Sequence, residues 1–322
     1  MKAIQFRSKD EMLLIQDAQM PELKEGYNIV EVSHASINHR DLWISKGKYA
    51  KIKFPIIPGS DFCGYLNGTR ILVNPGFFWG NNNAVQSDDF QILGLPQNGC
   101  FATFVSVPEE YIYKVPEHLS DAEASALPLA GITAYRALFS KCKPVAGETI
   151  LIHGIGGGVA LHVLQFAVVF GLKVFVTSSD DHKIEKAIQL GAIHGVNYLH
   201  SDWDVELLKE SGGFDIIIDS AAGISFQKLL NLCNGGARIC IYGGTQGIID
   251  GLSPQKIFWK QLSIFGSTMG TQNEFKEMLE FVEANKLVSI IDSISAFTEF
   301  ETVFKKMESG NQFGKLVLKI KE

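Results

Sequence analysis

Hydrophobic and polar positions change their spacing once along the chain. In the first third, short apolar or alternating runs are separated by Gly and Pro, at residues 2–6, 28–32, 70–73 and 102–107. Runs of this kind predict β-strands, so this part of the chain is expected to be β-rich. A long polar insertion, residues 76–99, contains Asn81-Asn82-Asn83 and predicts a surface loop.

From Ser120 onward the spacing becomes helical. Ser120 followed by Glu123 spells a capping box, which predicts the start of a helical region that runs to Phe139. Beyond it, apolar runs alternate with helical segments such as 183–190; the runs are 149–153, 174–176, 215–219, 238–242 and 262–265. Apolar strands separated by helices predict a parallel sheet covered on both faces. A helix at 273–286 and a strand at 315–319 close the chain.

The clearest element is residues 147–179, where strand, glycine turn, helix and strand follow one another. The turn, residues 154–158, leaves backbone N–H groups at the start of the helix, where the peptide dipoles favour an anion. Glycines let that backbone approach a pyrophosphate, and Ala160 lets the helix pack close to the strand. Val159 stands where the last glycine of G-x-G-x-x-G belongs. The surrounding βαβ unit of about thirty residues nevertheless favours a dinucleotide site over a plain turn.

The end of the second strand indicates which nucleotide is bound. NAD sites usually carry Asp or Glu there, which binds the ribose 2′-OH and repels a 2′-phosphate. Here the strand ends in Ser178-Ser179, and Lys183 follows. Two hydroxyls and an ammonium favour a phosphate, so the predicted cofactor is NADPH. Asp180 and Asp181 oppose this prediction unless they form the first turn of the next helix, where carboxylates are expected.

Composition excludes several classes of partner. A chain of 322 residues with 46% hydrophobic content is expected to form two domains, and a net charge of −6 gives no general attraction to nucleic acid or anionic lipid. The charged N-terminus lacks the apolar core of a signal peptide, and the run 159–176 contains His162, Gln165 and Lys173, which predicts a buried helix and strand, not a membrane span. Five dispersed cysteines fit a reduced, cytoplasmic protein.

Several motifs stand in a characteristic order: LAGITAYRAL at 129–138, IHGIGGGV at 152–159, LGA at 190–192 with Asn197-Tyr198, and FGKLVL at 313–318. With the β-rich first part, they resemble the medium-chain dehydrogenase/reductase superfamily, nearest to its zinc-less, quinone-oxidoreductase-like branch. The resemblance implies an α/β fold in which a Rossmann doubly wound parallel sheet, residues 126–267, accompanies a β-rich GroES-like catalytic domain, residues 1–125 and 268–322. The family's H-G-A-x-G-G-V-G loop corresponds here to Gly157, Gly158 and Ala160.

The resemblance also bears on metal binding. The family's zinc enzymes place a Cys ligand before His-x-Asp and a His-Glu pair after Pro-Gly, and the matching positions here are Asn38 and Ser60-Asp61. A catalytic zinc needs three protein ligands, so these residues predict no metal; His39 and Asp61 remain as alternative ligands. The four-cysteine lobe that holds a structural zinc is also missing, because residues 76–98 contain no Cys.

Without a metal, a reductase is favoured over an alcohol dehydrogenase. A quinone or an α,β-unsaturated carbonyl stabilises its own charge, so its reduction needs mainly positioning, a hydrogen bond to the oxyanion and exclusion of water. By resemblance, Asn38, Asp41 and Tyr49 line the catalytic cleft, with Asn38 or Tyr49 as hydrogen-bond donor. The alternatives are a turn residue for Asn38, a helix cap or a partner of Arg40 for Asp41, and a rim aromatic for Tyr49.

The predicted cofactor contacts, from the residues above and from the resemblance, are Thr133, Gly156, Gly157, Gly158, Val159, Ser178, Ser179, Lys183, Tyr198, Gly243, Gly244, Ser267 and Thr268. A strand-exit turn is the alternative for Gly243-Gly244. His153 is expected to be buried at the end of its strand and not to act as a base. Residues 262–267 form a candidate edge strand, and in this superfamily such strands pair across a two-fold axis, so a homodimer is expected.

The sequence therefore predicts an NADPH-dependent oxidoreductase that transfers hydride, without a metal, to a small-molecule quinone or activated alkene (enone or enal). Two alternatives remain open: a zinc-independent alcohol or carbonyl dehydrogenase, and a non-catalytic NADPH-binding redox sensor. Four aromatic residues are candidates for a pocket suited to flat substrates, with core packing the expected fate of about half of them; they are Trp43, Phe77, Phe78 and Trp79.

Overall fold

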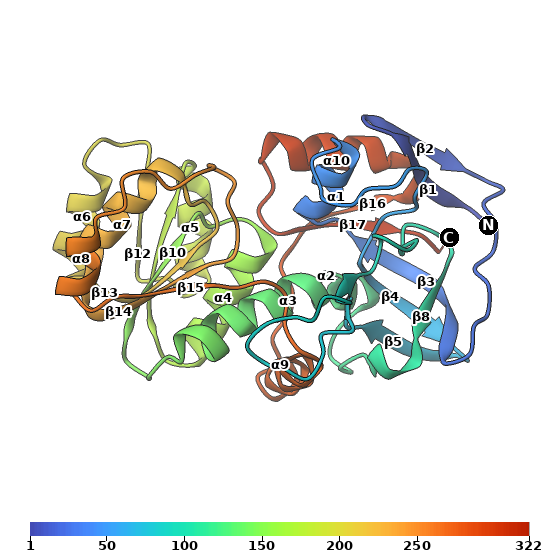
Figure 1. Cartoon of the computed structure of the whole chain (residues 1–322), viewed down its shortest axis with the longest axis horizontal. Coiled ribbons are helices and arrows are strands. Elements are labelled where there is room, and N and C mark those ends of the chain that lie inside the picture. Colours follow the sequence, from blue (N-terminus) through green and yellow to red (C-terminus); the bar gives the residue numbers. More distant parts are fainter. Residues whose placement is uncertain (322) are drawn as a thin grey trace. The chain divides into compact units, whose positions relative to one another are not determined.

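A computed structural model describes residues 1–321 of the chain (Figure 1). It divides into two compact units: residues 1–132 together with the chain from Gly270 onward, and Thr133–Met269. Each unit has a sheet of its own and is described separately. Among the described residues, no helix is both long enough and apolar enough to cross a membrane.

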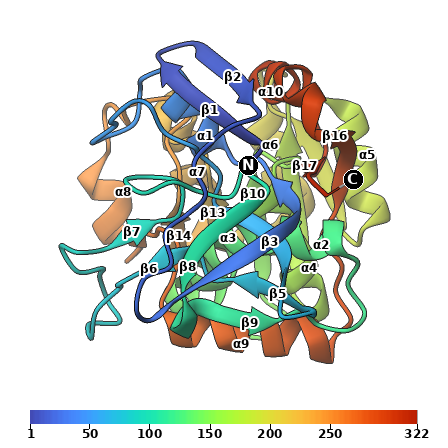
Figure 2. The same cartoon turned by 90° about the vertical axis from the view of Figure 1, so that its right-hand side faces the viewer.

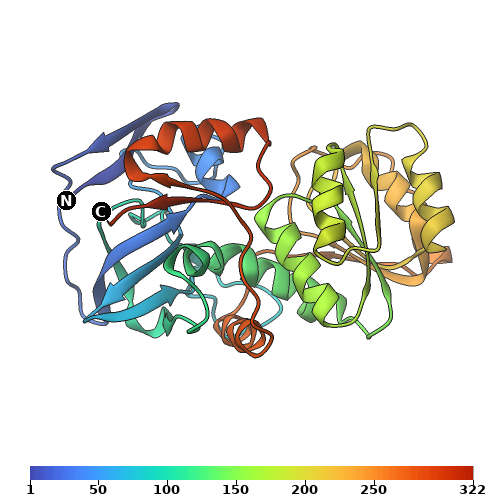
Figure 3. The same ribbon diagram turned by 180° about the vertical axis from the view of Figure 1, so that it is seen from behind.

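The unit Thr133–Met269 contains a six-stranded parallel sheet in the order β12-β11-β10-β13-β14-β15. Its strands are β10 (Thr149–His153), β11 (Lys173–Ser178), β12 (His194–Asn197), β13 (Phe214–Asp219), β14 (Cys233–Ile241) and β15 (Ser263–Gly266). The middle residues of the central strands β10 and β13 are apolar and buried because helices cover both faces of the sheet (Figure 3). The strand order reverses between β10 and β13, where ligands of doubly wound sheets bind. The predicted doubly wound fold is confirmed.

The helices of this unit are α4 (Gly158–Val169), α5 (Asp181–Gln189), α6 (Trp203–Ser211), α7 (Phe226–Leu232) and α8 (Pro254–Trp259), with a short 3-10 turn, η3 (Gly223–Ser225). Helix α4 is apolar on nearly every side, which is typical of a buried helix, and seven of its residues are buried. Leu151, Phe175 and Phe214 belong to the hydrophobic cluster of this unit, in which helix and strand side chains pack together.

The other unit is built on a seven-stranded sheet, with β8 paired to β3 beside the order β16-β17-β3-β4-β5-β9 (Figure 2). The strands are β3 (Tyr27–Ser36), β4 (Asp61–Leu66), β5 (Thr69–Val73), β8 (Phe104–Pro108), β9 (Ile112–Lys114), β16 (Ile291–Ala296) and β17 (Lys315–Lys319). Two hairpins accompany it, β1 (Ala3–Ser8) with β2 (Glu11–Ile15), and β6 (Gly76–Phe77) with β7 (Gln91–Ile92). This confirms the β-rich, GroES-like part of the predicted fold.

The remaining helices are α1 (His39–Ser45), α2 (Asp121–Ala126), α3 (Pro128–Tyr135), α9 (Gln272–Ala284) and α10 (Phe300–Ser309); three short segments, η1 (Glu109–Tyr111), η2 (Arg136–Cys142) and η4 (Phe297–Glu299), join them. The predicted capping box is confirmed, since the Ser120 amide donates to Glu123 Oε2 at 2.7 Å and the Glu123 amide donates to Ser120 Oγ at 3.3 Å.

The predicted helical region from Ser120 is confirmed, and it consists of more than one helix. The helical region expected from Ser120 to Phe139 is divided, because Pro128 lacks an N–H and its ring favours the first position of a new helix. Residues 136–142 then form a π-helix, which carries the helical region three residues beyond the predicted end. The polar spacing of the sequence contained no signal for this wider turn.

The insertion 76–99 is a surface loop only in part. Residues 80–86 are exposed, as expected for its Asn-rich stretch. Phe77 and Trp79, however, are buried and anchor the loop, and a hairpin of β6 and β7 closes it. The aromatic side chains therefore outweigh the surrounding polar residues.

Strand pairing in the second sheet brings three distant segments together. In the antiparallel pair of β17 and β3, Val317 lies opposite Ser36, and in the pair of β3 and β4, Asp61 lies opposite Ser36. Continuing the first register by two residues places Lys315 opposite Asn38, which directly follows β3. The end of β3 is therefore flanked by the first residue of β17 and the first residue of β4.

Candidate active site

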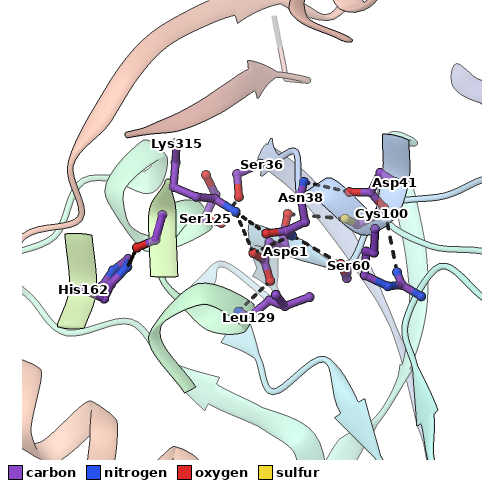
Figure 4. Close-up of polar contacts among 12 residues, drawn as sticks. Ser36, Asn38, Asp41, Ser60, Asp61, Cys100, Ser125, Leu129, His162 and Lys315 are labelled. Atoms are coloured by element: carbon purple, nitrogen blue, oxygen red, sulfur yellow. Dashed lines mark hydrogen bonds and ion pairs between the residues drawn. The ribbon is translucent and has the colours of Figure 1, made fainter. Parts of the chain in front are cut away.

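A closed polar cluster lies at the end of β3 (Figure 4). Asn38 Nδ2 donates to Asp61 Oδ2 at 2.9 Å, and the Lys315 ammonium donates to Asn38 Oδ1 at 2.5 Å and to Asp61 Oδ2 at 3.2 Å. The three side chains are 7%, 0% and 4% exposed, respectively. We call these three residues the Asn38 cluster. A positive and a negative charge are thus buried together, each with hydrogen-bonding partners, as burial of charge requires.

Neighbouring backbone groups complete the environment of Asp61. Its second carboxylate oxygen, Oδ1, accepts from the Leu129 amide at 2.9 Å, while Ser60 Oγ lies 3.5 Å from Asn38 Nδ2. Gly59 has φ +98°, and a Cβ there would lie 2.5 Å from the ring of Phe101. The turn that delivers Ser60 and Asp61 to the cluster therefore requires glycine. Both donors of the Asn38 amide face protein oxygens.

Asp41 and Tyr49 are held by contacts of their own. The Asp41 carboxylate is fully buried and accepts a hydrogen bond from the backbone N of Asn38 at 2.9 Å, so it caps the start of α1. Burial raises the pKa of Asp41 to about 6, against the opposing effect of the Arg40 guanidinium. Arg40 also lies over the half-buried Tyr49 ring, 5.3 Å from its centroid. Asp41 thus fixes the backbone of Asn38, and Tyr49 packs beside this capping pair.

The glycine turn after β10 presents the geometry expected of a phosphate-binding loop. Gly156 has φ +128°, and a Cβ on it would lie 2.9 Å from Lys183 Cδ and 3.5 Å from Lys183 Nζ. The Lys183 side chain therefore lies against the turn. Helix α4 begins at Gly158 with Gly157 as its N-cap, so the first N–H groups of that helix have no partner within it. A cationic side chain beside unpaired N–H groups fits the pyrophosphate-bearing cofactor that the sequence predicts.

The end of β11 explains the two acids that opposed the NADPH prediction. Asp180 is the N-cap of α5, and its side chain accepts from the His182 amide at 2.9 Å. Asp181 lies in the first turn and accepts from Asn197 Nδ2 at 2.9 Å. Ser178 is buried with its Oγ 3.2 Å from the Asp180 amide, whereas Ser179 is exposed. Asp180 therefore caps the helix, while the Asp181 carboxylate is held by Asn197 at the end of β12.

The remaining predicted cofactor residues are distributed over the same unit. Thr133 is buried in α3, Val159 lies half-buried in the first turn of α4, and Tyr198 packs 5.6 Å from the His153 ring. Gly243 and Gly244 follow β14, separated from its last residue by Tyr242. The exposed Thr268 is preceded by Ser267, whose buried Oγ has no hydrogen-bond partner among the described residues. An orphan hydroxyl directly after β15 is consistent with a ligand contact.

The histidines of this unit have structural contacts. His153 is buried, with Nδ1 2.8 Å from Thr177 Oγ1 and its ring stacked on Trp203. Burial lowers its pKa, and the prediction that it is not a base but a buried residue at a strand end is consistent with this environment. His162 Nδ1 lies 2.8 Å from the carbonyl of Gly158 within α4 (Figure 4).

A cavity of about 460 Å³ lies in the β-rich unit. Its walls carry aromatic and amide side chains, from Trp79, Gly80, Asn83, Tyr111, Tyr113, Thr271, Gln272, Asn273 and Lys276. This volume is within the range of small-molecule pockets. Of the four aromatic residues considered for a flat-substrate pocket, only Trp79 is among the lining residues named here; Phe77 is buried in the core, and Trp43 is partly exposed.

The donor set at the Asn38 cluster does not suit a metal ion. Within residues 1–321, no three His, Cys, Asp or Glu side chains gather where they would hold one. Asn38 Oδ1 and Asp61 Oδ2, the oxygen ligands that the cluster offers, already accept from the Lys315 ammonium. His39 is exposed, and within residues 1–321 no hydrogen bond or ion pair joins it to Asp61. A second cation beside this ammonium would be repelled.

Comparison with known proteins identifies the family. Profiles of two families match, "Alcohol dehydrogenase GroES-like domain" at residues 24–117 and "Zinc-binding dehydrogenase" at residues 158–284. A curated relative from Leptosphaeria maculans, "Zinc-type alcohol dehydrogenase-like protein YogA", is 33% identical and covers 91% of this chain and 90% of its own. This chain belongs to the medium-chain dehydrogenase/reductase superfamily.

Other members of the superfamily extend the comparison. The "Quinone oxidoreductase" of Homo sapiens is 28% identical over 88% of this chain and 84% of its own length. A solved structure, "Crystal Structure of NAD-dependent alcohol dehydrogenase", has a TM-score of 0.94 and 29% identity and covers both chains fully. These relatives support a generic oxidoreductase of the medium-chain dehydrogenase/reductase superfamily.

One site residue escaped the sequence reasoning. Lys315 was placed on the closing strand, yet it begins that strand as a buried cation, a rare position for Lys that required a partner. Asp41 was assigned to the cleft with a helix cap as the alternative, and the structure shows it capping α1. Lys315 had no comparable local signal, because its partners lie far away in the sequence.

Proposed function

We propose that this protein is an NADPH-dependent oxidoreductase that reduces a quinone or an activated alkene, such as an enone or enal, without a metal. The Asn38 cluster carries the proposal, because Asn38 and Asp61 stand at positions that match metal-ligand motifs of the superfamily's zinc enzymes, and a buried ammonium contacts both of them. An acceptor that delocalises its own negative charge needs hydrogen bonds and positioning more than a Lewis acid.

The coenzyme is proposed to rest on the glycine turn. The free N–H groups at the start of α4 would receive its pyrophosphate, and Gly156 leaves the room that this approach requires. Lys183 and Ser179 would receive the 2′-phosphate of NADPH. Gly243, Gly244 and the orphan hydroxyl of Ser267 are proposed as further contacts at the carboxyl edge of the sheet. When bound, the nicotinamide supplies a hydride.

The protein's own residues are proposed to handle the substrate. The Asn38 cluster orients the acceptor carbonyl by hydrogen bonding, while Asp41 holds the Asn38 backbone in place through the cap of α1. Tyr49 is proposed to border the substrate as a flat, partly buried ring and to supply a hydrogen bond. Burial of the cluster keeps water away from it, which strengthens each of these hydrogen bonds.

Nucleotide preference is tested with Lys183→Ala and, as a matched control on the same helix, Lys186→Ala. Loss of a charged contact to the 2′-phosphate is expected to weaken NADPH binding about tenfold or more and to leave NADH binding nearly unchanged. Fluorescence titration of both nucleotides measures this. Equal losses for NADPH and NADH would remove the case for phosphate recognition, and the similar structure named as an NAD-dependent alcohol dehydrogenase would then be the better guide.

Reaction class is tested by steady-state turnover with a panel of quinones, enones, enals, aldehydes and alcohols. Reduction of quinones or enones by NADPH is the expected result, and elemental analysis is expected to find no stoichiometric zinc. Turnover of alcohols or aldehydes alone would favour the alcohol or carbonyl dehydrogenase. Tight NADPH binding without any turnover would favour the redox sensor.

A homodimer is proposed on the basis of an exposed edge. β15 is the last strand of its sheet, and α8 before it ends in Phe258 and Trp259, which are 60% and 83% exposed. A free strand edge beside exposed aromatic residues is a surface that a second copy would cover by two-fold pairing.

A further inference from the structure

The Lys315 ammonium is the cationic centre of the Asn38 cluster. It is 4% exposed and lies at the first residue of β17, where the Lys315 amide N donates to the Ile290 carbonyl at 2.8 Å. β17 is paired on both sides, with β16 and with β3. The backbone that carries the ammonium is thus fixed within the sheet, so its position is pre-organised by the fold.

Two of the three N–H groups of the Lys315 ammonium are used in the Asn38 cluster. A lysine ammonium has three N–H groups and accepts none. Two of them are directed at Asn38 Oδ1 and Asp61 Oδ2, and among the described residues no other acceptor is recorded for the third. By contrast, the Asn38 amide donates to Asp61 and approaches Ser60 Oγ, so both of its N–H groups already face oxygens.

We infer that Lys315 is a catalytic residue, the hydrogen-bond donor that stabilises the substrate oxyanion in place of a metal ion. The inference rests on the proposed function, in which a quinone or enone accepts hydride. Two electrons and one hydrogen arrive at the acceptor carbon, the π electron pair moves onto the carbonyl oxygen, and Lys315 donates a hydrogen bond to that oxygen. A solvent proton then completes the reduced product.

Charge balance supports this role over that of a plain structural ion pair. Asp61 neutralises the ammonium in the resting cluster, and both of its carboxylate oxygens already accept hydrogen bonds, from Leu129 N on one side and from Asn38 and Lys315 on the other. Charge that develops on a substrate oxygen would therefore meet a donor whose orientation is already set. No reorganisation of the protein is then required as the charge forms.

The test uses the full-length protein loaded with NADPH and the variants Lys315→Met and Lys315→Arg. Lys319→Met, an exposed lysine on the same strand, is the matched control. Lys315→Met is expected to lower kcat with enones about 100- to 1,000-fold. Its dissociation constant for NADPH should change less than about threefold, and Lys315→Arg should recover part of the lost kcat because it keeps the charge.

Removal of Lys315 alone leaves Asp61 buried without its cation, which is expected to destabilise the fold. The double variant Asp61→Asn/Lys315→Met removes both charges, and the Asn oxygen can still accept from Leu129 N. If the single variant does not fold, the double variant carries the comparison with wild type. The loss should also be graded, larger for an enone than for a quinone whose reduced form stabilises its own charge.

Several outcomes would overturn the inference. A kcat within a few-fold of wild type would do so, as would a loss confined to NADPH affinity, which would make Lys315 a coenzyme phosphate contact. A wild-type protein that turns over no acceptor would instead refute the proposed function. In that case binding of 4-nitrophenol decides: wild type should lower the pKa of the bound phenol relative to Lys315→Met, and an equal or absent effect would overturn the role of Lys315.

Discussion

Gly156 offers the sharpest test of the glycine turn, because the structure separates its backbone requirement from its spatial one. Its φ of +128° lies in a region that residues with a Cβ rarely adopt. Replacement by alanine is expected to cost about 1–3 kcal/mol of unfolding free energy. The new Cβ would also lie 2.9 Å from Lys183 Cδ, but that atom belongs to a flexible side chain, which can move aside at small cost.

Gly157 is the matched control. It has φ −80° and ψ 159°, an ordinary extended conformation, and a Cβ there would meet nothing within 4 Å. Alanine is a poorer N-cap than glycine, but it also restricts the unfolded chain. Because the two effects offset each other, Gly157→Ala should stay within about 0.5 kcal/mol of wild type. Alanine is therefore expected to change the unfolding free energy differently at these two neighbouring positions, although both are glycine in the same run of the sequence.

The two variants are compared by urea unfolding without nucleotide and then by NADPH titration. Gly156→Ala is expected to lose stability before any ligand is added and, in addition, NADPH affinity, because Lys183 is displaced. Gly157→Ala is expected to lose affinity alone, since a methyl group would project where the pyrophosphate is proposed to rest. Equal stability of the two variants would refute the backbone argument, and unchanged NADPH binding in both would refute the location of the cofactor.

Two further predictions concern pH and assembly. Burial raises the pKa of Asp41 from 3.8 to about 6, and because the folded value exceeds the unfolded one, the stability from this group is present below about pH 4 and is lost as the pH rises to about 6. Asp41→Asn should abolish this loss, which amounts to about 2–3 kcal/mol of unfolding free energy. Urea unfolding of the variant and the wild type across this pH range measures it. A difference in unfolding free energy that does not change with pH would contradict the assignment. Trp259→Ser, which alters an exposed aromatic that shortly precedes β15, should weaken the proposed dimer in sedimentation equilibrium, and an unchanged association constant would exclude this face.

Much of the fold could be predicted because its signals are local. The apolar run 149–153 and the closing run 315–319 are strands with the predicted bounds. Both could be predicted because the pattern that marks each strand lies in consecutive residues, the second directly after Gly314. β4 was not predicted, because Asp61 opens it and Gly64 interrupts its apolar pattern. The helix from Ser120 was predicted at its start, where a cap marks it, but not at the break before Pro128.

The site shows the same division between local and distant information. The glycine turn and the acids of α5 depend on neighbours within a few residues, so the sequence was sufficient to single them out. The Asn38 cluster joins residues that are 23 and 277 positions apart, and only the register of β3 with β4 and β17 brings them together. Comparing the metal-ligand positions one at a time indicated that a set of metal ligands is missing here. It did not indicate that the Lys315 ammonium joins Asn38 and Asp61.

The register of β17 against β3 brings the Lys315 ammonium to Asp61. A shift of one residue would turn Lys315 to the opposite face of the sheet and bring an apolar neighbour toward Asp61, leaving its buried carboxylate with no cation. Because that arrangement is costly, the charge of Asp61 favours the observed register, as the apolar residues of β17 do. The same ion pair therefore helps to specify the fold and places an ammonium at the proposed catalytic centre, which is why its removal is tested with and without the Asp61 charge.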